Sequence, residues 1–142
     1  MILTGGDRET LTSSENVVTN NLIYDWSQVY RTYQAAVSLN GVGAVCSHNE
    51  IYNSPHEAIT YSGNNHVIEY NVIHDVVLES SDAGAIYAGR SWSYYGNVIR
   101  TTAFTTSAPK ILRRAAFILT MRFPDRKPTG ICLSTFRAVP SC

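Results

Sequence analysis

The chain has 142 residues, enough for one domain with a modest hydrophobic core. Its formal net charge of zero conceals two opposed regions: residues 1–100 contain four basic and ten acidic residues, whereas residues 101–142 contain seven basic and one acidic residue. The first region shows no basic patch that would predict nucleic-acid binding. No run approaches the roughly 20 apolar residues of a membrane span, and the first residues lack the basic start and apolar run of a secretory signal.

A repeated pattern organises the first hundred residues. The segments 17–25, 45–53 and 67–75 share the form Val-x-x-x-Asn-x-Ile-(Tyr/His)-(Asp/Asn), and residues 98–100 begin a fourth copy. Alternating apolar side chains on each side of the Asn predict two short strands. Because Asn tolerates the left-handed conformation, we expect Asn71 and its counterparts to form the corner between the strands.

A third short apolar run lies between successive copies, at residues 36–39, 58–61 and 85–88, and a Gly follows each run. Three short strands per repeat predict one coil of a parallel β-helix, whose strands pair with those of the coils above and below. The predicted fold class is therefore all-β, a parallel β-helix of about four coils over residues 14–100. Residues 1–13 are expected to be a partial N-terminal segment. Cys46 lies within a repeat and is expected to be a small buried residue.

These repeats resemble the right-handed parallel β-helix superfamily, which includes pectate lyases and many polysaccharide-acting enzymes. The resemblance implies that Asn21, Asn49 and Asn71 stack into a ladder along the axis, and stacked amides can indeed pair in this way. It also implies that a ligand lies along an outer face, beside the first strand of each coil and the loop before it. The loops concerned are residues 26–35, 54–57 and 76–84.

The third loop leads into the run Asp82-Ala-Gly-Ala-Ile-Tyr-Ala-Gly-Arg90, which looks like a motif of β-helix proteins grouped with glycoside hydrolases. We expect Asp82 as the catalytic acid or nucleophile, with Glu57 one coil below as a second carboxyl group. An aromatic ring can stack on a sugar and an Arg can bind a uronate. The substrate-binding candidates, expected to lie near Asp82, are Tyr87, Arg90, Trp92 and His56.

Each candidate also has a structural interpretation. Asp82 can be a turn residue that caps the next strand, Arg90 and Trp92 can be loop packing, and His56 is expected to be a surface loop residue. Tyr30 and Tyr33 can be sugar platforms or lids over the core. If Ile59 and Ile86 point into the core, alternation places Thr60 and Tyr87 on the outer face.

The predicted function is that of a carbohydrate-active protein resembling glycoside hydrolases, acting on a polysaccharide without a metal or other cofactor. One alternative is a non-enzymatic module for glycan binding or cell-surface adhesion. Another is a polysaccharide lyase, which is disfavoured because residues 1–100 contain no Lys as a base and no Asp cluster for Ca²⁺. The parent protein is expected to be extracellular or attached to the cell surface.

Residues 101–142 differ sharply, since all nine Tyr and all four His precede them. Reading their codons in a shifted frame permits Tyr-Asn-Gly-Phe-Tyr-His after Arg100, which would complete the fourth repeat. We therefore predict that residues 101–142 are a frameshifted tail and that the chain is an inactive, aggregation-prone fragment of a longer protein. The alternative is a basic amphipathic helix over residues 110–119.

Overall fold

The computed structural model describes residues 1–80, 83–89, 91–105 and 131–132. The strands are β1 (Ile2–Gly5), β2 (Val17–Thr19), β3 (Leu22–Tyr24), β4 (Val37–Val42), β5 (Val45–Ser47), β6 (Glu50–Tyr52), β7 (Ile59–Asn64), β8 (Val67–Glu69), β9 (Val72–His74), β10 (Ile86–Ala88), β11 (Val98–Arg100), β12 (Ala103–Thr105) and β13 (Ile131–Cys132). The described part of the chain contains no helix.

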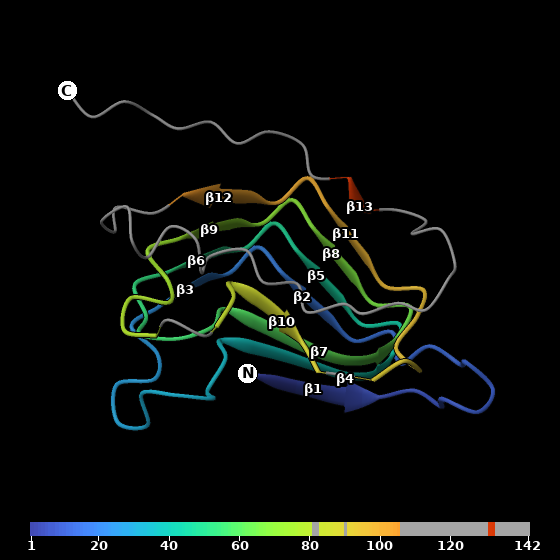
Figure 1. Ribbon diagram of the computed structural model, residues 1–142. Helices are drawn as coiled ribbons and strands as arrows, with labels where there is room; N and C mark the ends of the chain where they lie inside the picture. Colours follow the sequence, from blue (N-terminus) through green and yellow to red (C-terminus); the bar gives the residue numbers. More distant parts are fainter. Residues whose placement is uncertain (81–82, 90, 106–130, 133–142) are drawn as a thin grey trace.

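The strands form three parallel sheets, ordered β1-β4-β7-β10, β13-β11-β8-β5-β2 and β12-β9-β6-β3 (Figure 1). The chain visits each sheet in turn, so every coil contributes one strand to each. Equivalent residues of successive coils pair directly; Ile59, for example, pairs with Val37 below and Ile86 above. The predicted all-β, four-coil parallel β-helix is therefore confirmed. Within the predicted N-terminal segment 1–13, β1 pairs with β4 and is the first strand of the first coil.

Columns of inward-facing side chains fill the coil. Burying one aliphatic side chain stabilises the fold by about 1.5–3 kcal/mol, and the columns repeat this gain in each coil. The Cys46 side chain is fully buried, as predicted, and burial raises the pKa of its thiol to about 12. The buried members of the columns are Val37, Ile59 and Ile86; Leu39, Tyr61 and Ala88; Val18, Cys46, Ile68 and Ile99; and Ile51 and Ile73.

The amide side chains of three coils form a ladder beside these columns. Asn21 Nδ2 donates to Asn49 Oδ1 at 3.0 Å, and Asn49 Nδ2 donates to Asn71 Oδ1 at 3.0 Å. Asn49 and Asn71 are buried, so each amide that faces the core has a partner in the next coil. This satisfies polar groups that would otherwise destabilise the interior.

The corner itself differs from the prediction. The left-handed residue is not the ladder Asn but the exposed residue before it: Tyr70, for example, has φ +52° whereas Asn71 has no positive φ. The ladder requires the Asn side chain to face the core, so the backbone turns one residue earlier, where the side chain points to solvent. The corner residues with positive φ are Asn20, His48, Tyr70 and Thr101.

A buried histidine closes the turn after β7. The His66 side chain is fully buried; Nδ1 accepts the backbone N–H of Ala44 at 3.1 Å, and Nε2 lies 3.1 Å from the carbonyl oxygen of Ser62. These contacts fit a neutral ring that carries its proton on Nε2. Burial lowers the pKa of His66.

Glycine allows the strands of the first sheet to bend at their ends. Gly41 and Gly63 have φ values of +102° and +114°. A Cβ built on Gly63 would lie 1.9 Å from the carbonyl oxygen of Gly41, which is backbone and cannot move aside. Only glycine fits where two coils approach this closely.

The fourth coil continues past Arg100. Strand β12 pairs with β9 in register, with Phe104 beside Ile73. Thr102 occupies the place of the ladder Asn, and its hydroxyl donates to the Arg100 carbonyl at 3.2 Å. The frameshifted tail remains a prediction, and the alternative helix over residues 110–119 lies outside the described residues.

Candidate functional site

The outer face of the sheet β1-β4-β7-β10 carries short polar side chains in rows. Because Ile59 and Ile86 are buried, Thr60 and Tyr87 point outward, as strand alternation predicts. The Ser38 and Thr60 hydroxyl oxygens lie 2.9 Å apart across neighbouring coils. The same pattern repeats two residues further along each strand, where Ser62 Oγ donates to Asn40 Oδ1 at 2.7 Å and Asn40 Nδ2 contacts Thr4 Oγ1 at 3.5 Å. Hydroxyl and amide groups therefore recur with the period of the coil, about 4.8 Å.

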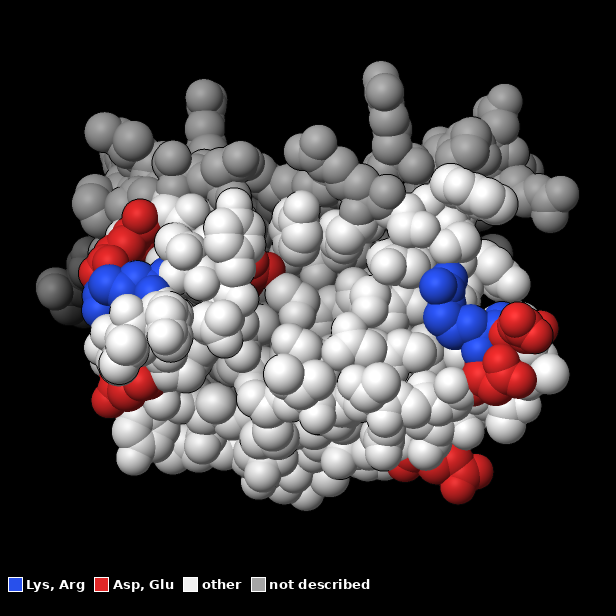
Figure 2. Space-filling view, turned by 90° about the horizontal axis from the view of Figure 1, so that it is seen from below, with Lys and Arg blue, Asp and Glu red and all other residues white. Residues whose placement is uncertain are grey.

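This outer face is largely uncharged. Figure 2, which looks at the molecule from the side of these strands, shows a broad neutral middle with most of the charged side chains gathered towards the flanks. The residues of the two rows, Thr4, Ser38, Asn40, Thr60 and Ser62, carry no ionisable group. A ligand over these two rows therefore meets hydrogen-bonding groups and no formal charge from the residues that form them.

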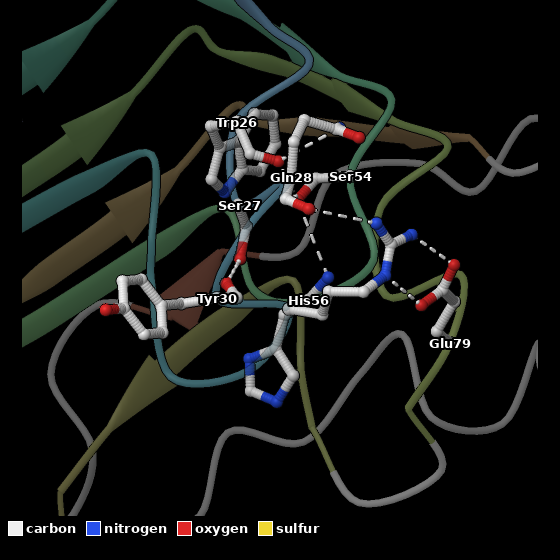
Figure 3. A network of polar contacts seen from close by, with 8 residues as sticks. Trp26, Ser27, Gln28, Tyr30, Ser54, His56 and Glu79 are labelled. Carbon is white, nitrogen blue, oxygen red and sulfur yellow. Dashed lines mark hydrogen bonds and ion pairs between the residues drawn. The ribbon is translucent and has the colours of Figure 1, made fainter.

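The loop of residues 26–35 borders the face before β4. Its exposed aromatic side chains are Tyr30 and Tyr33, which are 75 % and 83 % accessible. Trp26 anchors the loop, because its indole Nε1–H lies 3.1 Å from the Gln34 carbonyl oxygen and 3.3 Å from that of Glu57. Figure 3 shows Ser27 reaching the backbone of Tyr30 within the same loop.

A polar groove of about 500 Å³ lies where the loops of residues 26–35, 54–57 and 76–84 meet. The guanidinium of Arg31 forms an ion pair with the carboxylate of Glu79 across it, with Nε 2.6 Å from Oε2 (Figure 3). This pairing raises the pKa of Arg31 and lowers that of Glu79. The lining residues are Asp25, Gln28, Arg31, Asn53, Ser54, Pro55, Leu78 and Glu79.

His56 and Glu57 form a buried pair beside this groove. Each residue is only 3 % exposed, and His56 Nδ1 lies 3.0 Å from Glu57 Oε1. The two atoms are close without hydrogen-bond geometry, and Glu57 Oε2 has no hydrogen-bond partner among the described residues. Burial lowers the pKa of His56 and raises the pKa of Glu57. Both shifts favour the uncharged forms of the pair.

The expectation that His56 is a surface loop residue is therefore wrong. Its backbone is fixed by the next coil, since Val77 N–H donates to the His56 carbonyl at 3.1 Å. Its ring lies under the loop of residues 26–35, with the Tyr33 ring centroid 5.3 Å away. The cover comes from segments more than 20 residues away in the sequence, so no local pattern could predict it.

The structure separates Trp92 from Glu57. Glu57 precedes β7, whereas Trp92 follows β10, and these strands pair in parallel, so the two residues lie at opposite ends of the sheet. The six residues of β7 at about 3.3 Å each put roughly 20 Å between the two ends. Trp92 is 83 % exposed, and Tyr87 lies between the ends on the outer face. Asp82 and Arg90 lie outside the described residues.

Sequence reasoning missed Arg8, which borders the Trp92 end of the face. Its Nε donates to Asn64 Oδ1 at 3.0 Å, a terminal nitrogen donates to Ser93 Oγ at 2.9 Å, and the guanidinium lies 5.1 Å from the centroid of the Tyr94 ring. These contacts join residues up to 86 positions apart in the chain, and nothing near Arg8 in the sequence signals them.

A stack of rings runs along the outer face of the sheet β12-β9-β6-β3. The centroids of Tyr24 and Tyr52 are 5.4 Å apart, and those of Tyr52 and His74 are 4.7 Å apart. In the sequence, this stack corresponds to the position of the repeat that is occupied by Tyr or His. Because the rings cover one another's faces, the inner ones have little face left for a ligand.

The described residues contain no group of three or more His, Cys, Asp or Glu able to hold a metal ion. Within the same residues, no helix is long and apolar enough to cross a membrane. Comparison of the chain with protein-family models, curated proteins and solved structures finds no match in any of the three. The strand pairing defines the chain as a parallel β-helix protein, and its most regular exposed feature is the neutral face of the sheet β1-β4-β7-β10.

Proposed function

We propose that this protein binds an extended polysaccharide on the neutral face, with the sugar chain running along the stacking axis of the coils. The observation that carries the proposal is the two rows of polar side chains. In one row Ser38 pairs with Thr60, and in the other Thr4, Asn40 and Ser62 stand at equivalent positions of three neighbouring coils. A polymer of sugar units presents hydroxyl groups with a repeat of its own, so one set of contacts can be made several times along the axis. Such a role suits a protein outside the cell or on its surface.

Exposed aromatic rings frame both ends of the strands. Tyr30 and Tyr33 border one end, and Trp92 lies beyond the other. A ring that is more than 70 % accessible and is not stacked on another ring offers a free apolar face, which suits the C–H face of a sugar. The combination of a polar floor and aromatic borders favours a glycan over a peptide or a lipid.

Hydrolysis of the bound glycan is the second candidate, and it is the activity that the resemblance to β-helix glycoside hydrolases implies. The observation in its favour is Glu57, a carboxyl group at the edge of the face whose pKa is raised by burial. A general acid must be protonated at working pH, and burial shifts the pKa of Glu57 in that direction. The reaction also requires a second carboxylate, and Asp82 in the next coil is the candidate.

The burial of Glu57 limits this second function. A carboxyl group that is 3 % exposed cannot protonate a glycosidic oxygen until the cover above it moves. The loop of residues 26–35 lies against the pair, since Trp26 Nε1–H donates to the Glu57 backbone carbonyl and the Tyr33 ring lies beside that of His56. Binding therefore comes first in the proposal, and hydrolysis depends on a movement of this loop.

Isothermal titration calorimetry against a panel of soluble polysaccharides tests the binding. Thr60→Val removes a hydroxyl from the face; since a hydrogen bond is worth about 0.5–1.5 kcal/mol, we expect affinity to fall about 2- to 10-fold. Thr19→Val is the matched control, because Thr19 forms a similar hydroxyl pair with Ser47 at 3.2 Å on another sheet. Failure of every polysaccharide to bind, or an equal loss in both variants, would contradict the proposal.

Release of reducing ends from the bound polysaccharide tests the hydrolysis. We expect Glu57→Gln to abolish turnover while leaving the affinity within a factor of about two, because the side-chain amide keeps the shape but cannot donate the acid proton. Tight binding with no turnover in the unaltered protein would reject hydrolysis and leave the binding function standing.

A further inference from the structure

We infer that the polysaccharide bound on the neutral face is uncharged, and that the face discriminates against polyuronates and other anionic glycans. This inference rests on the proposed binding function and specifies its ligand class. It follows from where the described positive charges lie and what each one already contacts.

The described part of the chain contains three arginines, and each is engaged. Arg31 is paired with Glu79, and Arg100 Nε lies 2.5 Å from Glu69 Oε2. Arg8 is held at the flank by two side-chain hydrogen bonds and by the Tyr94 ring. The N-terminal ammonium donates to the Ala36 carbonyl at 2.7 Å. Within the described residues, none of these cations lies in the two rows of the face.

Histidine does not supply the missing charge. His56 lies nearest to the edge of the face, but it is buried and its pKa is lowered, so its ring is neutral at neutral pH. His66 is enclosed within the coil and binds backbone groups on both sides of its ring. Among the described residues of this face, a carboxylate on a sugar would therefore find no cationic partner.

The charge balance of residues 1–100 acts in the same direction, while the chain as a whole has a formal net charge of zero. Residues 1–100 contain ten acidic and four basic residues, so this region repels an anionic polymer. A polyuronate would lose water from its carboxylates on binding and would gain no ion pair in return. A neutral glycan has no such cost, and its hydroxyl groups match the hydroxyl and amide groups of the face.

The decisive experiment compares one sugar backbone in three charge states. We take whichever neutral polysaccharide of the panel binds, its counterpart with the primary hydroxyls oxidised to carboxylates, and the methyl ester of that oxidised polymer. At low salt, the oxidised polymer should bind at least about tenfold more weakly, and the difference should shrink towards 0.5 M salt because the charges are screened. Methyl esterification should restore most of the affinity, which separates the effect of charge from the loss of a hydroxyl.

A charge added to the face provides the second arm. Thr60→Lys should strengthen binding of the oxidised polymer severalfold at low salt, whereas Thr19→Lys, on a different sheet, should not. Circular dichroism establishes that both variants remain folded. Equal gains in the two variants would show that total charge governs selectivity rather than the face, and would overturn the inference.

The outcomes distinguish the two proposals. If the oxidised polymer binds as tightly as the neutral one, or more tightly, the inference of a neutral ligand is wrong while the binding function stands. If no polymer of the panel binds in any charge state, the proposed function itself fails, and the inference about its ligand fails with it.

Discussion

Asn71 accepts two hydrogen bonds from Asn49 on a single oxygen: the side-chain Nδ2 and the backbone N–H of Asn49 both lie 3.0 Å from Asn71 Oδ1. Asn71 Nδ2 in turn donates to the Cys46 carbonyl at 2.9 Å. One buried amide therefore joins the corner of its own coil to the corner of the coil below by three hydrogen bonds.

Replacing this amide should be costly. Asn71→Ala leaves a buried side chain and a backbone N–H of Asn49 without their acceptor, and we expect a loss of about 2–5 kcal/mol in the free energy of unfolding. Urea denaturation followed by circular dichroism measures the loss. Asn16→Ala is the control, because the Asn16 amide makes a longer contact of 3.4 Å to the Thr4 carbonyl. Similar losses of unfolding free energy in the two variants would show that the ladder amide stabilises the fold no more than the Asn16 amide does.

The ladder can also be extended. Thr102 stands at its next position, so Thr102→Asn should give the Asn71 amide a new partner and stabilise the protein by about 1 kcal/mol. The shifted reading frame predicted for residues 101–142 also permits Asn at this position. Thermal unfolding measures the change, with the exposed Thr19→Asn as control. A destabilised Thr102→Asn variant would mean that the fourth coil does not continue the ladder.

Glycine is required at the bend of β7 but not after β10. Gly63→Ala should destabilise the protein by more than about 2 kcal/mol, since its φ of +114° and its contact with Gly41 both exclude a Cβ. Gly89→Ala is the matched substitution, because among the described residues a Cβ there would meet only a Tyr94 side-chain atom at 3.7 Å. Chemical denaturation of both variants should show a large loss for Gly63→Ala and a small change for Gly89→Ala.

The buried histidine predicts a loss of stability in acid. The pKa of folded His66 lies below its ordinary value of 6.5, so the unfolded chain binds a proton more readily. The stabilisation is complete above pH 6.5 and is lost as the pH falls towards the folded pKa. His66→Asn should flatten the fall in unfolding free energy between pH 7 and 5. The control is His48→Asn, which removes an exposed ring; an equal flattening there would refute the assignment to His66.

Glu57 predicts the opposite dependence on pH. Its folded pKa is raised from 4.5, so the folded state holds the proton more tightly, and stability falls as the pH rises from 4.5 through the folded pKa. Glu57→Gln removes this penalty and should make the protein more stable at pH 8 but not at pH 4. Unfolding curves at the two pH values test it, with the exposed Glu15→Gln as control. A variant less stable at pH 8 would show that the carboxylate is stabilised by its surroundings.

The fold was predictable because the same strand pattern occurs in several copies along the chain. Val67 to Asp75 contains both strand patterns and the ladder Asn, and each copy supports the same architecture. The pattern could not show that Tyr70 rather than Asn71 takes the left-handed corner. The alternation of apolar residues predicts which side chains face the core. It does not predict which residue takes a positive φ, because that depends on the backbone path needed to point the ladder Asn inward.

The site was predictable only in part. The outward placement of Thr60 and Tyr87 follows from the strand period alone. The burial of His56 and Glu57 depends on a loop that folds back from an earlier coil, which local patterns cannot reveal. Trp92 is close to Glu57 neither in the chain nor in space: a full strand length of sheet separates the two.

The hydroxyl pair of Ser38 and Thr60 has a consequence for the thermodynamics of recognition. Each hydroxyl is oriented by its neighbour across the coils at 2.9 Å before any ligand arrives. The entropy lost when these two hydroxyl groups stop rotating is therefore lost on folding and not on ligand binding. The pair retains one O–H donor and spare lone pairs that a ligand can use. Association on this face should consequently show a small loss of protein conformational entropy, with most of the ordering confined to the ligand.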